Sequence, residues 1–177
     1  MSHSPKVELL CSDLAALDIQ AIVCPAHKHL IKGKGLSAQI FEAAGQEMVF
    51  ACNALPGCPV GEARITPGFQ LPAKSVIHTV TPQWTGGDQW GGADLRLLRK
   101  CYESVFQLAM EQGITEVALP ALGAGTNRAP QIMAAKIGLE VVFEYAPKFE
   151  RLVICLHSAQ AYEFWHDEYL KYLPQSV

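Results

Sequence analysis

Short, almost uninterrupted apolar segments alternate with longer stretches of helical periodicity along this chain. Residues 21–24 (AIVC), 116–119 (EVAL) and 152–157 (LVICLH) are the clearest of these segments, and such runs are typical of strands covered on both faces. Strands of this kind that alternate with helices predict a parallel sheet between helix layers. The sequence therefore predicts an α/β protein with three α/β/α layers and a mixed, mostly parallel sheet of about six strands. We expect residues 21–24 and 116–119 to be its central strands.

The other elements follow from the same patterns. Apolar residues recur at helical spacing over residues 94–112, and Gly113 stands where a helix C-terminus favours glycine. Pro130 opens another helical stretch in the first-turn position that proline tolerates. We also expect strands at residues 7–11, 63–66 and 75–80, and helices at residues 36–53 with a break near Gly45, 94–112, 130–145 and 159–172.

The composition is that of a folded protein of ordinary charge. With 177 residues, of which 50% are apolar and 18% charged, the chain is long enough to bury a full core. We expect one domain over residues 1–177, with its core over about residues 7–172. The net charge of −3 excludes a histone-like basic protein and a disordered acidic chain. A nucleic-acid partner is therefore not expected.

Neither a membrane span nor a secretory signal is expected. No apolar run reaches the ~18 residues that a spanning helix needs, and residues 1–7 (MSHSPKV) lack the apolar stretch of a signal peptide. The 6 cysteines are scattered and form no CxxC pair. This pattern favours reduced thiols, several of them buried, in a cytoplasmic protein.

Two glycine-bearing loops follow the expected central strands. The first contains Lys32-Gly33-Lys34-Gly35, and the second covers residues 123–129 (GAGTNRA). Ligands of parallel sheets bind beyond the carboxyl ends of the strands. Glycine lets backbone N–H groups approach an anion, and a helix N-terminus adds about half a positive charge. The two loops together suit a diphosphate, although each loop alone could be a plain connection.

Several stretches of the chain, taken in order, resemble the macro domain, an α/β/α module that binds ADP-ribose. The resemblance extends over residues 7–169 and implies one small-molecule partner, ADP-ribose or a related adenine nucleotide, free or protein-linked. We expect no cofactor. The resembling stretches are residues 12–14 (SDL), 21–23 (AIV), 43–45 (AAG), 57–66 (GCPVGEARIT), 71–74 (LPAK), 76–80 (VIHTV), 120–121 (PA) and 134–137 (AAKI).

The resemblance also implies roles for individual residues. Asp13 would accept a hydrogen bond from the adenine amino group, and the alternative is that its carboxylate caps the turn after the first strand. The two glycine loops would hold the diphosphate and the terminal ribose. The implied ligand-binding residues are Asp13, Leu14, Gly33, Lys34, Gly35, Leu36, Gly123, Ala124, Gly125, Thr126, Asn127 and Arg128.

The sequence departs from the family pattern at the terminal-ribose end. Hydrolytic members of the family carry Asn-Ala-Ala-Asn after the second strand, where this chain has Cys24-Pro25-Ala26-His27. They also carry an Asp after the first glycine loop, where this chain has Ser37, and an aromatic residue in the second loop, where it has residues 127–129 (NRA). A serine does not supply the charge of a carboxylate at neutral pH. We therefore expect weak or no ADP-ribosyl hydrolysis by the usual family route.

The replacements suggest two other kinds of chemistry. A cysteine beside a histidine can become a thiolate nucleophile, so Cys24, His27 and Ser37 are the candidates for catalysis, with no role assigned. Cys24, His27 and His29 place three possible metal ligands within residues 24–29, but structural zinc sites use four ligands, and we expect no bound metal. The remaining polar and aromatic candidates, interpreted as structural or interface residues, are His78, Phe164, Trp165, Tyr169 and Tyr172.

The sequence therefore predicts a module that binds ADP-ribose or a related adenine nucleotide in a crevice between two glycine loops. Two alternatives stay open. One is an active hydrolase of mono-ADP-ribose, O-acetyl-ADP-ribose or ADP-ribose 1″-phosphate with a non-standard site. The other is a pseudo-module that keeps the fold and uses its surface for protein contacts.

Overall fold

A computed structural model describes residues 6–83, 92–124 and 131–173 of the chain, and the elements below lie within these ranges. Residues 125–130 of the second glycine loop and residues 84–91 of the Trp- and Gly-rich stretch lie outside them. The strands are β1 (Val7–Cys11), β2 (Ala21–Pro25), β3 (Ala63–Pro67), β4 (Ser75–Thr79), β5 (Glu116–Leu119) and β6 (Arg151–Leu156). The helices are η1 (Leu14–Ala16), α1 (Leu36–Ala44), α2 (Gln46–Asn53), α3 (Gly92–Glu111), α4 (Gln131–Tyr145), η2 (Ala146–Lys148) and α5 (Ala159–Leu170).

The sheet has the order β1-β6-β5-β2-β4-β3. Four of its five neighbouring pairs are parallel, and only β3 runs antiparallel to its neighbour β4. The expectation of a mixed, mostly parallel sheet with β2 and β5 at its centre is confirmed. Because β1, β6, β5, β2 and β4 run in one direction, their carboxyl ends meet at one edge of the sheet.

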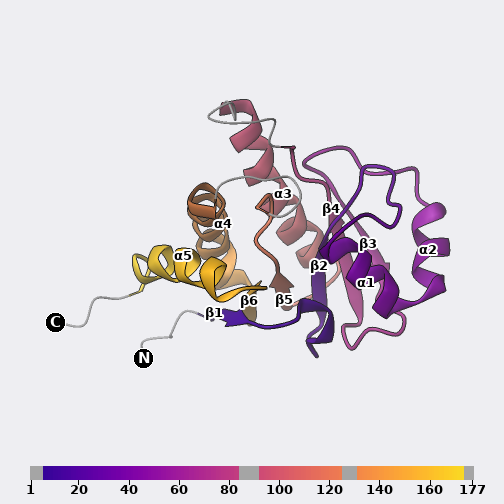
Figure 1. The fold of residues 1–177 in the computed structure, drawn as a ribbon, viewed down its shortest axis with the longest axis horizontal. Coiled ribbons are helices and arrows are strands. Elements are labelled where there is room, and N and C mark those ends of the chain that lie inside the picture. Colours follow the sequence, from indigo (N-terminus) through magenta and orange to yellow (C-terminus); the bar gives the residue numbers. More distant parts are fainter. Residues whose placement is uncertain (1–5, 84–91, 125–130, 174–177) are drawn as a thin grey trace.

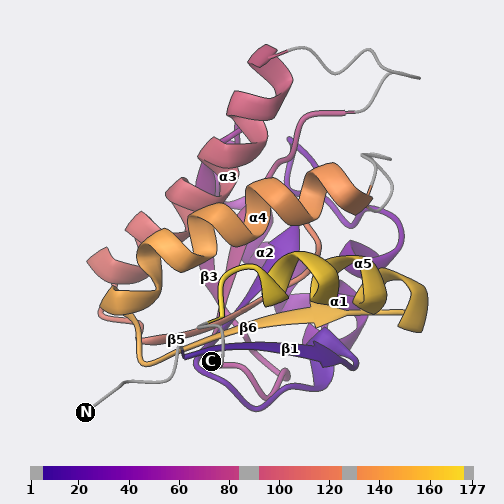
Figure 2. The same cartoon turned by 90° about the vertical axis from the view of Figure 1, so that its left-hand side faces the viewer.

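Helices cover both faces of the sheet (Figures 1 and 2). The helices α1 and α2 pack on one face, and α3, α4 and α5 pack on the other. Strand β2 shows why its sequence is apolar throughout: Ala21 and Val23 join the core beneath α3 and α4, whereas Ile22 and Cys24 join the core beneath α1. This arrangement confirms the three-layer α/β/α fold expected from the apolar runs.

The expected break in the first helix also occurs. Gly45 separates α1 from α2 with a φ of 93°, a left-handed conformation that favours glycine. The other ends coincide with the expected ones or differ from them by one or two residues. Strand β6 begins at Arg151 and ends before His157, and α5 ends at Leu170 rather than at residue 172. Helix α3 begins at Gly92, two residues before the expected start.

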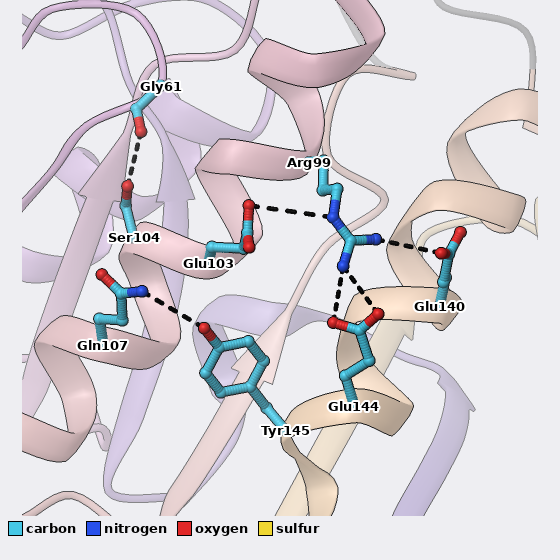
Figure 3. Close-up of polar contacts among 8 residues, drawn as sticks. All are labelled: Gly61, Arg99, Glu103, Ser104, Gln107, Glu140, Glu144 and Tyr145. Atoms are coloured by element: carbon cyan, nitrogen blue, oxygen red, sulfur yellow. Dashed lines mark hydrogen bonds and ion pairs between the residues drawn. The ribbon is translucent and has the colours of Figure 1, made fainter.

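Polar contacts join α3 to α4 on the outside of the molecule (Figure 3). The Arg99 guanidinium of α3 lies 3.2 Å from a carboxylate oxygen of Glu140 and 2.6 Å from one of Glu144, both on α4. Glu103 on α3 is a third, more distant partner at 3.9 Å. Glu140 and Glu144 lie one turn apart on α4, so a single arginine of α3 pairs with two positions on the outer face of that helix.

Candidate active-site cleft

The carboxyl edge of the sheet carries a cleft made of two adjoining cavities. The β2 cavity, named for the loop after β2, has a volume of about 650 Å³. The β1 cavity, bordered by the residues after β1, has a volume of about 660 Å³. Ala121, in the loop after β5, lines both cavities. The position agrees with the rule that open α/β sheets bind ligands beyond the carboxyl ends of their strands.

Asp13 and Leu14 lie in the β1 cavity, directly after β1. The Asp13 Oδ1 atom accepts a hydrogen bond of 3.1 Å from the backbone N–H of Ala15, so this residue caps η1. Asp13 is nevertheless exposed and borders the cavity, while Leu14 is buried beneath it. Capping and ligand contact are thus compatible, since a carboxylate has a second oxygen to offer.

The first glycine loop runs along the junction of the two cavities. Gly33 and Lys34 line the β2 cavity, whereas Gly35 and Leu36 line the β1 cavity. Gly35 precedes α1 with φ 60° and ψ −128°, a backbone conformation that side-chain-bearing residues rarely adopt. No side chain caps the start of α1. Its first-turn N–H groups therefore remain available to an anion in the cleft.

The second glycine loop is described only at its beginning. Gly123 has a φ of 85° and lines the β2 cavity, and Ala124 lines the β1 cavity. Residues of both glycine loops thus line one cleft, together with Ala121. The other expected ligand contacts in this loop lie outside the described residues, namely Gly125, Thr126, Asn127 and Arg128.

Cys24 has no access to the cleft. Its side chain is 0% exposed, and burial raises the pKa of its thiol to about 12. Both observations count against a thiolate nucleophile at this position, because a buried thiol with a raised pKa stays protonated at neutral pH. Its polar neighbour is Ser37, whose hydroxyl is within hydrogen-bonding reach of the thiol. Ser37 itself is buried at 3% exposure and borders the β2 cavity, where its Oγ accepts a 3.4 Å hydrogen bond from the Gly33 N–H.

His27 is the candidate that does face the β2 cavity. Its Nδ1 atom accepts a 3.1 Å hydrogen bond from the backbone N–H of His29, which holds the neutral ring in the tautomer with the proton on Nε2. His27 and His29 are exposed with ring centroids 5.3 Å apart, whereas Cys24 is buried. These three residues accordingly form no ligand cluster, and no group of three or more metal-binding side chains gathers elsewhere in the described ranges.

His78 lies in the core rather than in the cleft. It is 0% exposed on β4, and its Nε2 atom lies 2.9 Å from the Thr66 hydroxyl. Its ring also packs edge-on against Phe41 of α1. Burial lowers its pKa to about 4. These contacts are those of a structural residue.

The macro domain family model matches residues 23–138. The chain belongs to the macro domain family. It is 40% identical to a macro domain-containing protein of Ralstonia nicotianae over 150 residues, 85% of this chain and 86% of the relative. It is 33% identical to the ADP-ribose glycohydrolase MACROD2 of Mus musculus over 98% of this chain but 37% of that protein.

Solved macro domains share the whole described fold. The Oceanobacillus iheyensis macrodomain with ADP superposes with a TM-score of 0.88 at 29% identity, covering 97% of this chain and 95% of the other. The macro domain of ganglioside induced differentiation associated protein 2 gives a TM-score of 0.90 at 30% identity, with coverages of 98% and 87%. Within the described part of this macro domain, no helix has both the length and the apolar character required to cross a membrane.

Sequence reasoning missed several residues that border the β1 cavity of this macro domain. Phe164, expected in the core or an interface, is 37% exposed and lines the cavity from α5, while its neighbour Trp165 is fully buried. Gln131 lines it from the start of α4, and Cys155 and His157 from the end of β6. An aromatic run at helical spacing does not reveal which ring faces a cleft. His157 stands at the carboxyl end of the expected strand of residues 152–157, and this place is the sequence signal that could have pointed to it.

Proposed function

We propose that this macro domain binds ADP-ribose or a related adenine nucleotide in the cleft formed by the β1 and β2 cavities. The observation that carries the proposal is the shared position of Asp13, the uncapped start of α1 and Ala121 in one continuous cleft. Each element suits one part of such a ligand. The family supports the same ligand, because the Oceanobacillus iheyensis and Trypanosoma brucei macrodomains were solved with ADP.

The β1 cavity suits the nucleobase. Leu14 and the exposed ring of Phe164 offer apolar surfaces, and aromatic faces pack well against flat heterocycles. The Asp13 carboxylate offers an acceptor for an exocyclic amino group. The cavity volume of about 660 Å³ lies in the range of small-molecule sites.

The middle of the cleft suits a diphosphate. The first-turn N–H groups of α1 carry partial positive charge, and Gly35 has no side chain to keep an anion away from them. Gly123 and Ala124 line the same cleft. The exposed Lys34 adds a full positive charge at the β2 cavity.

The terminal ribose would enter the β2 cavity. The carboxylate that the usual family route of hydrolysis requires is missing from the described part of its lining. The described residues that line this cavity include no Asp and no Glu. The family resemblance implies that Ser37 stands where hydrolytic members carry Asp, and its hydroxyl accepts the hydrogen bond from the Gly33 N–H. Loss of a general base typically reduces a rate by about 10²–10⁴-fold. We therefore propose a binder with weak or no hydrolase activity.

One observation favours a second candidate, a hydrolase with a non-standard site. The Nε2 side of the His27 ring is left without a partner among the described residues, and the ring lines the β2 cavity. Turnover of ester-linked or arginine-linked ADP-ribosyl protein, O-acetyl-ADP-ribose or ADP-ribose 1″-phosphate at several per minute would establish an enzyme. Loss of that rate in His27→Ala would assign the chemistry to this residue.

Calorimetry with ADP-ribose, ADP, AMP and NAD tests the binding proposal. A size-matched pair of variants places the site: Ala121→Glu puts a carboxylate at the junction of the cavities, whereas Ala121→Gln adds the same bulk without charge. We expect Ala121→Glu to bind ADP-ribose at least about tenfold more weakly than Ala121→Gln, because the added charge repels the diphosphate. If the wild type binds none of these ligands, the pseudo-module is the remaining alternative. If the two variants bind ADP-ribose with equal affinity, the diphosphate does not bind beside Ala121.

A further inference from the structure

Gln131 and Trp165 form a polar contact at the wall of the β1 cavity. The indole Nε1–H of Trp165 donates a 3.0 Å hydrogen bond to the Gln131 Oε1 atom. Trp165 is 0% exposed, whereas Gln131 is partly exposed and lines the cavity. The contact joins the first turn of α4 to α5, two helices that pack side by side (Figure 2).

The indole fixes the orientation of the Gln131 amide. An indole nitrogen donates a hydrogen bond but does not accept one, so the amide oxygen must face Trp165. The NH₂ group then points away from the indole. Among the described residues, no acceptor for this NH₂ group is found, and Gln131 borders the β1 cavity, so the group is available to a ligand there.

The position of Gln131 in the cleft indicates which part of a nucleotide it meets. In the proposed function the base contacts Leu14 and Phe164 and the phosphates lie near Gly35 and Ala124, and all four residues line the β1 cavity. In an adenine nucleotide the ribose lies between the base and the phosphates. A side chain that borders the same cavity from the start of α4 is placed for the sugar.

We propose that Gln131 is a specificity-determining residue that donates an amide N–H to a hydroxyl oxygen of the adenosine ribose, with Trp165 as its positioning residue. The inference rests on the proposed function and adds to it a preference for ribonucleotides over nucleotides that lack the 2′- and 3′-hydroxyls. A neutral hydrogen bond of this kind changes affinity by about fivefold to tenfold.

The test compares ADP with 2′,3′-dideoxy-ADP by calorimetry on three proteins. The wild type should bind ADP about fivefold to tenfold more tightly than the dideoxy analogue. Gln131→Met, which keeps the length of the side chain and removes the amide, should bind the two ligands with nearly equal affinity. Trp165→Phe, which keeps Gln131 but frees its amide to rotate, should give an intermediate ratio. The matched control is Gln107→Met, since Gln107 lies on α3 and contacts Tyr145 instead (Figure 3).

The ratio of the two affinities separates this role from a structural one. A general loosening of the site would weaken both ligands equally and leave the ratio unchanged, which would overturn the inference while the proposed function stands. A wild type that does not distinguish the two ligands would overturn it in the same way. If the wild type binds neither ADP nor ADP-ribose, the proposed function fails and the inference fails with it.

Discussion

The Ser37 hydroxyl stands between two loops of the cleft, accepting the Gly33 N–H at 3.4 Å and lying within hydrogen-bonding reach of the buried Cys24 thiol. The contact ties the first glycine loop to the end of β2. Ser37 thus holds the loop while bordering the β2 cavity, whereas Cys24 is fully buried.

We expect Ser37→Ala to weaken ADP-ribose binding by about threefold to tenfold, because the Gly33 N–H loses its acceptor and the loop loses its attachment. The matched control is Ser104→Ala, which removes a 2.7 Å hydrogen bond to the Gly61 carbonyl, because neither residue lines the β1 or the β2 cavity (Figure 3). Both variants should lose a similar, small amount of stability in chemical unfolding. If calorimetry finds equal affinities for Ser37→Ala and the wild type, the first glycine loop does not need the Ser37 hydroxyl to keep its binding conformation.

Asp13 offers a variant that separates its two contacts. Asp13→Asn keeps an oxygen for the Ala15 N–H but removes the charge, whereas Asp13→Ala removes both. We expect Asp13→Asn to retain the melting temperature and Asp13→Ala to lose about 1 kcal/mol of stability. Affinity for ADP-ribose should fall by roughly 1–3 kcal/mol in Asp13→Ala. Calorimetry that found wild-type affinity in Asp13→Ala would remove this residue from the binding site.

His78 makes folding stability depend on pH. Burial lowers its pKa from 6.5 to about 4, so between these values the unfolded chain binds a proton that the folded protein does not. Stability should be constant above about pH 6.5 and fall as the pH is lowered toward 4. Compared with His78→Gln, the wild type should lose roughly 2–3 kcal/mol more between pH 7.5 and 4.5. Urea unfolding of both proteins at the two pH values measures this, and parallel losses would show that His78 is not the cause.

Gly138 is expected to tolerate no side chain. A Cβ atom there would lie 2.6 Å from the Tyr102 hydroxyl and 2.7 Å from Trp165 Cη2, and both of these side chains are fully buried. Gly138→Ala should therefore cost about 1–3 kcal/mol, despite the better helix propensity of alanine. The double variant with Tyr102→Phe should recover part of the loss in thermal unfolding, because it removes the closest contact. Strictly additive effects would argue against a clash at this hydroxyl.

The fold was largely predictable because it depends on apolar runs, helical periodicity and glycine positions, which can be seen in the sequence itself. The apolar run of residues 21–24 marks a strand buried on both faces, and the structure places Ile22 in one core and Val23 in the other. Gly45 marked a helix break because its left-handed backbone favours glycine. Such signals are local, and each has few structural solutions.

The site was less predictable because it depends on which way side chains face. Cys24 and His27 are three positions apart, yet the first is buried beneath α1 and the second borders the cleft. Phe164 and Trp165 are adjacent in the sequence, yet Phe164 lines the cleft and Trp165 is fully buried. Gln131 carried no signal in the sequence, since its orientation is fixed by an indole 34 positions away.

The distribution of thiols has a practical consequence for all of these measurements. Burial raises the pKa of five cysteines, Cys24, Cys52, Cys58, Cys101 and Cys155, whereas Cys11 is exposed at the end of β1. A maleimide dye should therefore attach to the native protein at Cys11 alone, and to the other thiols only after unfolding. Because Cys11 lies two positions before Asp13, the unmutated chain carries its own fluorescent reporter position at the rim of the cleft.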